Sequence, residues 1–157
     1  MLGRFWKDYL APILGRPPRF QVAALCWRRG TTGIEVLLVT SLETRRWILP
    51  KGWPHSGLDA AGGALAEAWE EAGVKPQGGR PELIGAYRYN KRLTGNLPVA
   101  TVVHVHAIEV SKLHEEYPEA GRRERRWMSP ADAAAAVDEP ELARLLLQLP
   151  TLLGPGT

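Results

Sequence analysis

The stretch LPKGWPHSGLDAAGGALAEAWEEAGV, residues 49–74, decides how this 157-residue chain is interpreted. Asp59 is a typical helix N-cap residue and Gly73 a typical C′ residue, so the sequence predicts a helix over 60–72. The residues at 51–58 include two glycines and a proline, which predict a loop. The stretch is therefore interpreted as a loop that leads into a short, capped helix.

Three glutamates share one face of this predicted helix. Glu67, Glu70 and Glu71 have i, i+3 and i+4 spacing, which places them within roughly 60° either side of one line on a helix that turns about 100° per residue. The apolar residues of the other side are expected to face the core: Leu65, Ala68, Trp69 and Ala72. The helix is thus predicted to separate a charged face from a packed face.

The three glutamates have no basic partner on the predicted helix, because Gly63 and Ala66 occupy the positions where a cation would pair with them. Like charges at this spacing destabilise a helix by about 0.2–0.5 kcal/mol per pair. Bound Mg²⁺ reverses that effect, since it takes carboxylate oxygens, waters and substrate phosphates as ligands. A solvated acidic face accounts for the spacing equally well, because exposed glutamate runs are common on helices.

The segment resembles the Nudix box, in which a Gly is followed at fixed spacings by Glu, Arg-Glu, Glu-Glu, Gly and an apolar residue. The matching positions are Gly52, Glu67, Ala68, Glu70, Glu71, Gly73 and Val74. Leu58 and Ala66 stand where the box has its first Glu and its Arg, two residues that pair in the family to brace the loop against the helix. Because both are replaced, neither leaves an unpaired partner behind, and the metal face is unchanged. We interpret the pattern as a subgroup variant.

The resemblance extends beyond the box. Pro-Lys-Gly-Trp-Pro at 50–54, Trp-Glu-Glu-Ala-Gly-Val at 69–74 and Arg-Trp-Met-Ser-Pro-Ala-Asp-Ala-Ala at 126–134 are similar to bacterial Nudix members described as like diphosphoinositol polyphosphate phosphohydrolases. This implies an α/β (α+β) fold, the Nudix-type α/β/α sandwich with a mixed β-sheet between helices. It also implies a metal-dependent hydrolase that cleaves a phosphoanhydride bond in a nucleoside- or inositol-diphosphate-linked small molecule.

The resemblance leaves the substrate open between inositol pyrophosphates, diadenosine polyphosphates, nucleotide sugars and oxidised nucleotides. The alternative function is a non-catalytic Nudix-fold module that binds a phosphorylated ligand, and the replacements at Leu58 and Ala66 are its support.

The resemblance also implies a cofactor, Mg²⁺ or Mn²⁺, and its ligands. Glu67, Glu70 and Glu71 are the implied metal ligands and catalytic residues, and the carbonyl of Gly52 is a further ligand. The general base stays open between these glutamates and a loop carboxylate. The loop candidates are Glu115, Glu116 and Glu119, which are explained equally well as solvated charges.

Basic and aromatic residues around the box are the candidate substrate contacts. Arg46 and Lys51 are predicted to grip phosphates, the arginine bidentately and the lysine as a point charge. Trp53 is the best stacking candidate because of its loop position, and Arg88 extends the phosphate site from the end of a strand. Solubility, or an exposed hairpin tip, explains the basic residues as well. His55, in the box loop, is a further candidate for touching the substrate.

The rest of the chain predicts further strands and two terminal helices. The predicted strands span 21–28, 34–41, 47–49, 83–90, 99–110 and 125–128, and the helices span 130–137 and 139–149. One domain is expected over 19–150, preceded by an arm over 1–18 that ends in two prolines and followed by a flexible tail over 151–157.

Composition limits the function classes. Apolar residues make up 45% of the chain and charged residues 24%, which is typical of a globular protein. The single cysteine, Cys26, excludes a disulfide within the chain and disfavours a structural zinc site. The net charge of +3 and a basic run at 122–126 without interleaved aromatics do not indicate nucleic-acid binding.

The sequence also predicts a compartment and partners. No stretch resembles a transmembrane segment or a signal peptide, so the protein is expected to be cytoplasmic and to have no membrane partner. The expected partner is a phosphorylated small molecule. Nudix proteins are often dimers, and the sequence leaves a homodimer open.

Overall fold

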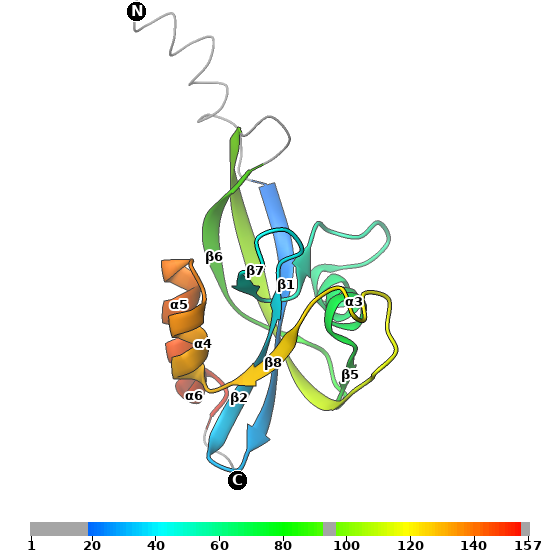
Figure 1. Ribbon diagram of the computed structural model, residues 1–157, viewed down its shortest axis with the longest axis vertical. Helices are drawn as coiled ribbons and strands as arrows, with labels where there is room; N and C mark the ends of the chain where they lie inside the picture. Colours follow the sequence, from blue (N-terminus) through cyan, green and yellow to red (C-terminus); the bar gives the residue numbers. More distant parts are fainter. Residues whose placement is uncertain (1–18, 93–96, 155–157) are drawn as a thin grey trace, which may run out of the picture.

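The computed structural model describes residues 19–92 and 97–154, in which one sheet lies between helices (Figure 1). The strands are β1 (Arg19–Gly30), β2 (Gly33–Thr40), β3 (Trp47–Ile48), β4 (Lys51–Gly52), β5 (Val74–Pro76), β6 (Glu82–Arg92), β7 (Pro98–Leu113) and β8 (Arg125–Met128). The helices are α3 (Ala60–Ala72), α4 (Pro130–Ala136), α5 (Pro140–Leu147) and α6 (Leu149–Leu152).

The sheet is mixed. β1 and β7 run parallel at its centre, with Arg19 opposite Thr101 and Trp27 opposite Glu109, and the other described pairings are antiparallel. The strand order is β3-β2-β1-β7-β5, while β4 pairs with β1, β6 with β7 and β8 with β2. α3 covers one face of the sheet, and α4 and α5 cover the other (Figure 1). The predicted sandwich of helices around a mixed sheet is confirmed.

β1 shows why the central strands read as continuous apolar runs. Ala23, Leu25 and Trp27 belong to the core cluster shared with α4, α5 and α6, whereas Ala24 and Cys26 belong to the cluster under α3. Successive side chains of a strand point to opposite faces, so a strand covered by helices on both faces must be apolar throughout. The sheet therefore has a separate core on each face.

Two features of the element boundaries differ from the prediction. The structure adds the short strands β4 and β5, which have too few residues to show a detectable period. The helix expected over 139–149 is divided into α5 and α6, with Pro150 in the first turn of α6, because proline is tolerated at a helix start and breaks a helix interior.

The expected terminal segments are only partly described. The tail expected from residue 151 begins inside α6, which extends to Leu152. The arm expected over 1–18 lies outside the described residues. Within the described ranges, no helix combines the length and the apolar character that crossing a bilayer requires.

α3 packs on the sheet through small side chains. Ala64, Ala68 and Ala72 are each 1% exposed or less and belong to the core cluster on this face. Trp69 was expected in the core, but it is 39% exposed and packs edge-on against His114, with ring centroids 5.3 Å apart. This part of the predicted core face is wrong.

The glutamates of α3 also differ from the prediction, which placed them opposite the core. Glu67 and Glu71 are each only 6% exposed. At about 100° per residue they border the stripe of alanines on one edge, and Trp69 lies beyond its other edge. Because alanines bring the helix close to the sheet, the side chains along the glutamate edge are covered too. The face that packs is rotated toward the carboxylates.

Candidate active site and metal cluster

Both ends of α3 are held by the residues that the sequence marks as caps. Asp59 Oδ1 accepts a hydrogen bond from the Gly62 N–H at 2.8 Å. Gly73 has φ 66°, in the left-handed region that favours glycine. Arg125 Nη1 donates to the Ala72 carbonyl at 2.8 Å, which places a cation at the negative end of the helix. A rigid element therefore positions the glutamates.

Glu67 lies in a close cradle formed by the loop before the helix. A Cβ added at Gly52 would collide with Glu67 Oε1, so only glycine permits this approach. His55 Nε2 lies 2.7 Å from the same oxygen. This hydrogen bond raises the pKa of His55 above its usual value. The opening Gly of the box is thus explained by the space that Glu67 needs.

Glu70 forms a cluster with His55 and Glu67, and these three residues are called the acidic cluster below. One possible ligand atom from each residue lies within 4.8 Å of the others. The backbone carbonyl of Glu70 also accepts a hydrogen bond from the Glu119 N–H at 3.0 Å, which ties a loop to the helix. The sequence did not predict His55 as a member of the cluster, because a single loop histidine has no periodic signal and only the folded loop brings it to Glu67.

Glu71 lies beside this cluster without belonging to it. Its Oε2 accepts a hydrogen bond from the Lys51 backbone N–H at 3.4 Å, and its Oε1 lies 3.6 Å from Arg123 Nη2. Burial raises the pKa of Glu71 to about 8; Arg123 opposes the shift and Glu67 adds to it. A nearby divalent cation stabilises the charged form of such a carboxyl.

The donor set fits a hard divalent cation. Mg²⁺ and Mn²⁺ take carboxylate oxygens, which Glu67 and Glu70 supply here. An imidazole nitrogen suits softer metals. His55 therefore fits the role of orienting the Glu67 carboxylate through their hydrogen bond.

Lys51 and Trp53 flank Gly52. Lys51 Nζ lies 5.0 Å from the centroid of the Tyr89 ring, and burial lowers the pKa of Lys51 to about 8, with Lys91 contributing to the shift. Trp53 is 37% exposed, and Arg19 and Lys91 lie 5.9 and 5.5 Å from its ring centroid. Cations from β1, β4 and β6 thus lie at the aromatic rings of Trp53 and Tyr89.

Arg46 and Lys51 share one acidic neighbour, Glu139. Arg46 Nη1 lies 3.2 Å from Asp138 Oδ2 and 3.5 Å from Glu139 Oε1. Both Arg46 and Glu139 influence the charge of Lys51. The fold therefore brings these two predicted phosphate contacts into one neighbourhood.

Arg88, like Arg46, forms an ion pair with an acidic residue at the start of α5. Its Nη2 lies 3.0 Å from Glu141 Oε2, and its side chain is 76% exposed. Glu141 belongs to the first turn of α5, on the sheet face opposite α3. The contacts of Arg88 in the described structure thus turn it toward α5 and do not join it to the glutamates.

Among the three loop carboxylates considered as general base, Glu119 is the one that the fold brings to α3. Its side chain is 17% exposed and shares Arg123 with Glu71. Glu115 has a 93% exposed side chain, and Glu116 is exposed as well. The sequence has no signal to choose among the three, because the path of the loop decides which one faces the helix.

The box loop is held without the Glu-Arg pair of the family, whose positions are Leu58 and Ala66. Leu58 is 49% exposed, and its N–H donates to the His55 carbonyl at 3.2 Å. The adjacent Asp59 forms an ion pair with Arg80, which precedes β6. A local turn and a different ion pair therefore connect this loop to the rest of the molecule.

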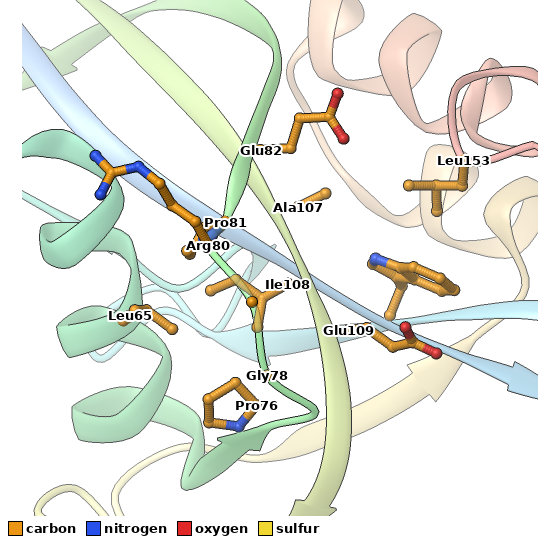
Figure 2. Close-up of a pocket in the computed structure, with 12 residues that line it drawn as sticks. Leu65, Pro76, Gly78, Arg80, Pro81, Glu82, Ala107, Ile108, Glu109 and Leu153 are labelled. Atoms are coloured by element: carbon orange, nitrogen blue, oxygen red, sulfur yellow. The ribbon is translucent and has the colours of Figure 1, made fainter.

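A cavity of about 150 Å³ opens between α3, β7 and the segment before β6 (Figure 2). Its lining residues include Leu65, Pro76, Arg80, Ile108 and Leu153. None of the three glutamates of α3 lines it, so the cavity is separate from the acidic cluster.

Comparison with known proteins gives a clear family match. The family model for the NUDIX domain matches residues 18–149. Human diphosphoinositol polyphosphate phosphohydrolase 3-beta is 33% identical over 116 residues, which are 72% of this chain and 65% of that protein. Nudix hydrolase 4 of Arabidopsis thaliana is 33% identical over 102 residues, which are 63% of this chain and 45% of that protein. The chain thus spans 65% or less of the length of these relatives. The phosphohydrolase relative is human, whereas the motifs at 50–54, 69–74 and 126–134 led us to expect a similarity to bacterial members.

Solved structures share the fold at low identity. The Ap4A hydrolase of C. elegans superposes with a TM-score of 0.64 at 19% identity, over 88% of this chain and 100% of that chain. A NUDIX hydrolase from Nitrosomonas europaea superposes with a TM-score of 0.65 at 17% identity, over 86% of this chain and 90% of that chain. The NUDIX domain of Shewanella oneidensis NrtR, complexed with ADP ribose, superposes with a TM-score of 0.59 at 18% identity, over 94% of this chain and 97% of that chain. The family model matches residues 18–149, and the three glutamates of the box lie on α3. This chain therefore belongs to the Nudix family.

Proposed function

We propose that this Nudix protein is a metal-dependent hydrolase that cleaves a phosphoanhydride bond in a small, polyphosphorylated molecule. The observation that carries the proposal is the burial of Glu67 and Glu71 on one helix edge, with Glu70 beside them. Buried charges are costly unless they are paired, and like charges add to that cost. Glu71 is a buried carboxyl whose pKa is raised by burial, and such groups are typical of functional sites.

The glutamates of α3 and the residues near them each have a proposed role. Glu67, Glu70 and Glu71 are the proposed catalytic residues and metal ligands, and the Gly52 carbonyl is a further ligand. When bound, Mg²⁺ or Mn²⁺ polarises phosphate oxygens and lowers the pKa of a bound water. His55 holds the Glu67 carboxylate in one orientation. The general base is proposed to be Glu71 or Glu119, the two carboxylates that meet at Arg123.

The proposed substrate contacts are basic and aromatic residues in and near the box loop, together with Arg88 on β6. Lys51 and Arg46 are proposed to bind phosphate oxygens, and Trp53 to pack against the non-reacting part of the substrate. Arg88 extends the phosphate site only if its ion pair with Glu141 opens. The several cations favour a substrate with many phosphates, and the names of the relatives, which refer to diphosphoinositol polyphosphate and to Ap4A, support the same class.

The test is release of phosphate or nucleotide from one inositol pyrophosphate, one diadenosine polyphosphate, one nucleotide sugar and one oxidised nucleotide. Each reaction is run with Mg²⁺, with Mn²⁺ and with chelator. We expect metal-dependent turnover of one substrate class, and its loss in a Glu70→Gln, Glu71→Gln double variant. The matched control, Glu43→Gln with Glu82→Gln, changes two exposed glutamates and is expected to keep the parent rate.

The outcomes separate an enzyme from a binding module. A folded Glu70→Gln, Glu71→Gln variant that hydrolyses every substrate as fast as the parent would exclude this site as the catalytic one. If no substrate is turned over, yet phosphorylated ligands bind and raise the melting temperature, the chain is a non-catalytic module for such ligands.

A further inference from the structure

Arg123 connects α3, β2 and the loop before β8. Its Nη2 lies 3.6 Å from Glu71 Oε1 and 3.3 Å from Glu119 Oε1. Its Nη1 donates to the Thr40 carbonyl at 3.0 Å. The arginine side chain is only 9% exposed. A single guanidinium thus lies between two carboxylates that would otherwise repel each other.

The geometry of these contacts requires an arginine. The planar guanidinium has five N–H donors in a fixed fork, so it can contact two carboxylates and a carbonyl at once, which the compact ammonium of lysine does not reproduce. The Thr40 carbonyl lies at the end of β2, and this contact anchors the fork to the sheet.

The same loop is joined to the helix by backbone contacts. The Glu119 N–H donates to the Glu70 carbonyl at 3.0 Å, and the His114 N–H donates to the Gly73 carbonyl at 2.8 Å. Repulsion between Glu71 and Glu119, when both are in their charged forms, opposes this closure. Arg123 removes that repulsion at the point where the loop meets the acidic cluster.

α3 itself has no cation to do this, since no lysine or arginine occurs within Ala60–Ala72 and Ala66 precedes the first buried glutamate. We propose that Arg123 is a positioning residue that holds the Glu71 and Glu119 carboxylates together at the site of the divalent cation. The inference rests on the proposed function. It places on the loop before β8 the organising cation that α3 lacks.

The test is Mn²⁺ binding in the absence of substrate, by isothermal titration calorimetry and by the electron paramagnetic resonance signal of free Mn²⁺. In Arg123→Met we expect the affinity for Mn²⁺ to fall by roughly 10–100-fold, as is usual when a partner behind the ligands is removed. Arg123→Lys restores part of the loss, because it keeps the charge without the fork. Faster hydrogen exchange at the Glu119 amide is expected in Arg123→Met, because the loop no longer closes on Glu70.

Arg122→Met is the matched control. Arg122 also lies 3.6 Å from Glu119 Oε1, but its side chain is 60% exposed, and its described ion pair does not extend to Glu71. We expect this variant to bind Mn²⁺ as the parent does and to keep the exchange rate of the Glu119 amide. Unfolding curves establish that each variant is folded at the temperature of the binding experiment. If Arg123→Met does not fold, the comparison of Arg123→Lys with Arg122→Lys decides the question.

Each outcome has one meaning. Arg123→Met that binds Mn²⁺ as tightly as the parent, or more tightly, overturns the positioning role, and tighter binding identifies Arg123 as a competitor of the metal. A loss of stability with unchanged Mn²⁺ affinity and unchanged amide exchange shows a purely structural role and also overturns it. If the parent chain itself binds no Mn²⁺, the proposed metal-dependent function fails, and the inference fails with it.

Discussion

The two helical layers of this protein pack on the same sheet in different ways. α5 covers its face with Leu142, Leu145 and Leu146, whose side chains are at most 7% exposed. α3 covers the opposite face with small alanines and buries the carboxylates Glu67 and Glu71 beside them. The α5 layer buries apolar side chains, as protein cores usually do, whereas the α3 layer also buries charged ones.

This difference separates stability from chemistry. Buried leucines contribute about 1.5–3 kcal/mol each relative to exposure. Buried carboxylates oppose folding unless they are paired or bind a cation. A fold keeps such an arrangement where the site needs it, and the violation of a packing rule is therefore a guide to function. We expect changes in the α3 layer to affect turnover and changes in the α5 layer to affect stability.

The largest expected effect is on turnover in Glu67→Gln. The amide keeps the size of the side chain and its contact with His55, but it removes the negative charge that is proposed to hold the cation. Losing several kcal/mol of transition-state stabilisation lowers the rate by at least about 100-fold. Steady-state assays with Mg²⁺ measure the rate, and urea unfolding is expected to show a stability change within about 1 kcal/mol.

A Gln variant with unchanged turnover would contradict the division between the layers. The control is Glu109→Gln, which changes an exposed glutamate of β7 and is expected to leave both turnover and stability unchanged.

Leu146→Ala is the converse experiment in the α5 layer. Leu146 is fully buried, and truncation to alanine leaves a cavity that costs about 2–5 kcal/mol of unfolding free energy. Urea unfolding measures the loss. Turnover per folded molecule, measured well below the melting temperature, is expected to stay at the parent value.

The exposed neighbour Leu147 gives the comparison for this prediction. It is 59% exposed, so Leu147→Ala is expected to change stability by less than about 0.5 kcal/mol. A large fall in turnover in folded Leu146→Ala would show that the two layers are coupled through the sheet.

A further expected effect is a pH dependence of stability in the metal-free protein. Burial raises the folded-state pKa of Glu71 from 4.5 to about 8, so the folded protein retains a proton that the unfolded chain has lost. The stabilisation from this proton is complete below about pH 4.5 and is lost as the pH rises to about 8.

Lys51 makes the stability change with pH in the opposite direction above about pH 8. Burial lowers its folded-state pKa from 10.5 to about 8, so the unfolded chain holds the extra proton between these values and stability rises with pH. With chelator present, the two groups together predict a stability minimum near pH 8.

Urea unfolding across this pH range measures both slopes. Glu71→Gln is expected to remove the falling slope and Lys51→Met the rising one. Persistence of the falling slope in Glu71→Gln would assign it to another group.

The sequence predicted the elements that depend on local signals. The helix over 60–72 has the predicted bounds, because Asp59 and Gly73 are caps whose effect is local. Of the two central strands, the one over 21–28 was predicted from a short apolar run and the one over 99–110 from alternating residues. The sequence did not show that Trp69 is exposed and Glu67 covered, because the rotation of an amphipathic helix on a sheet depends on how closely its small residues approach the strands.

The sequence by itself determined the Nudix box and the identity of the three helix glutamates, since both are encoded in residue type and spacing along one segment. The layered fold followed from the family resemblance and from the order of predicted strands and helices along the chain. Only the tertiary structure decided that His55 contacts Glu67, that Glu119 is the loop carboxylate near α3, and that Arg123 lies between Glu119 and Glu71. These contacts join residues far apart in the chain or in irregular loops. No periodic pattern encodes such meetings, because they arise from where the sheet and its loops bring the backbone.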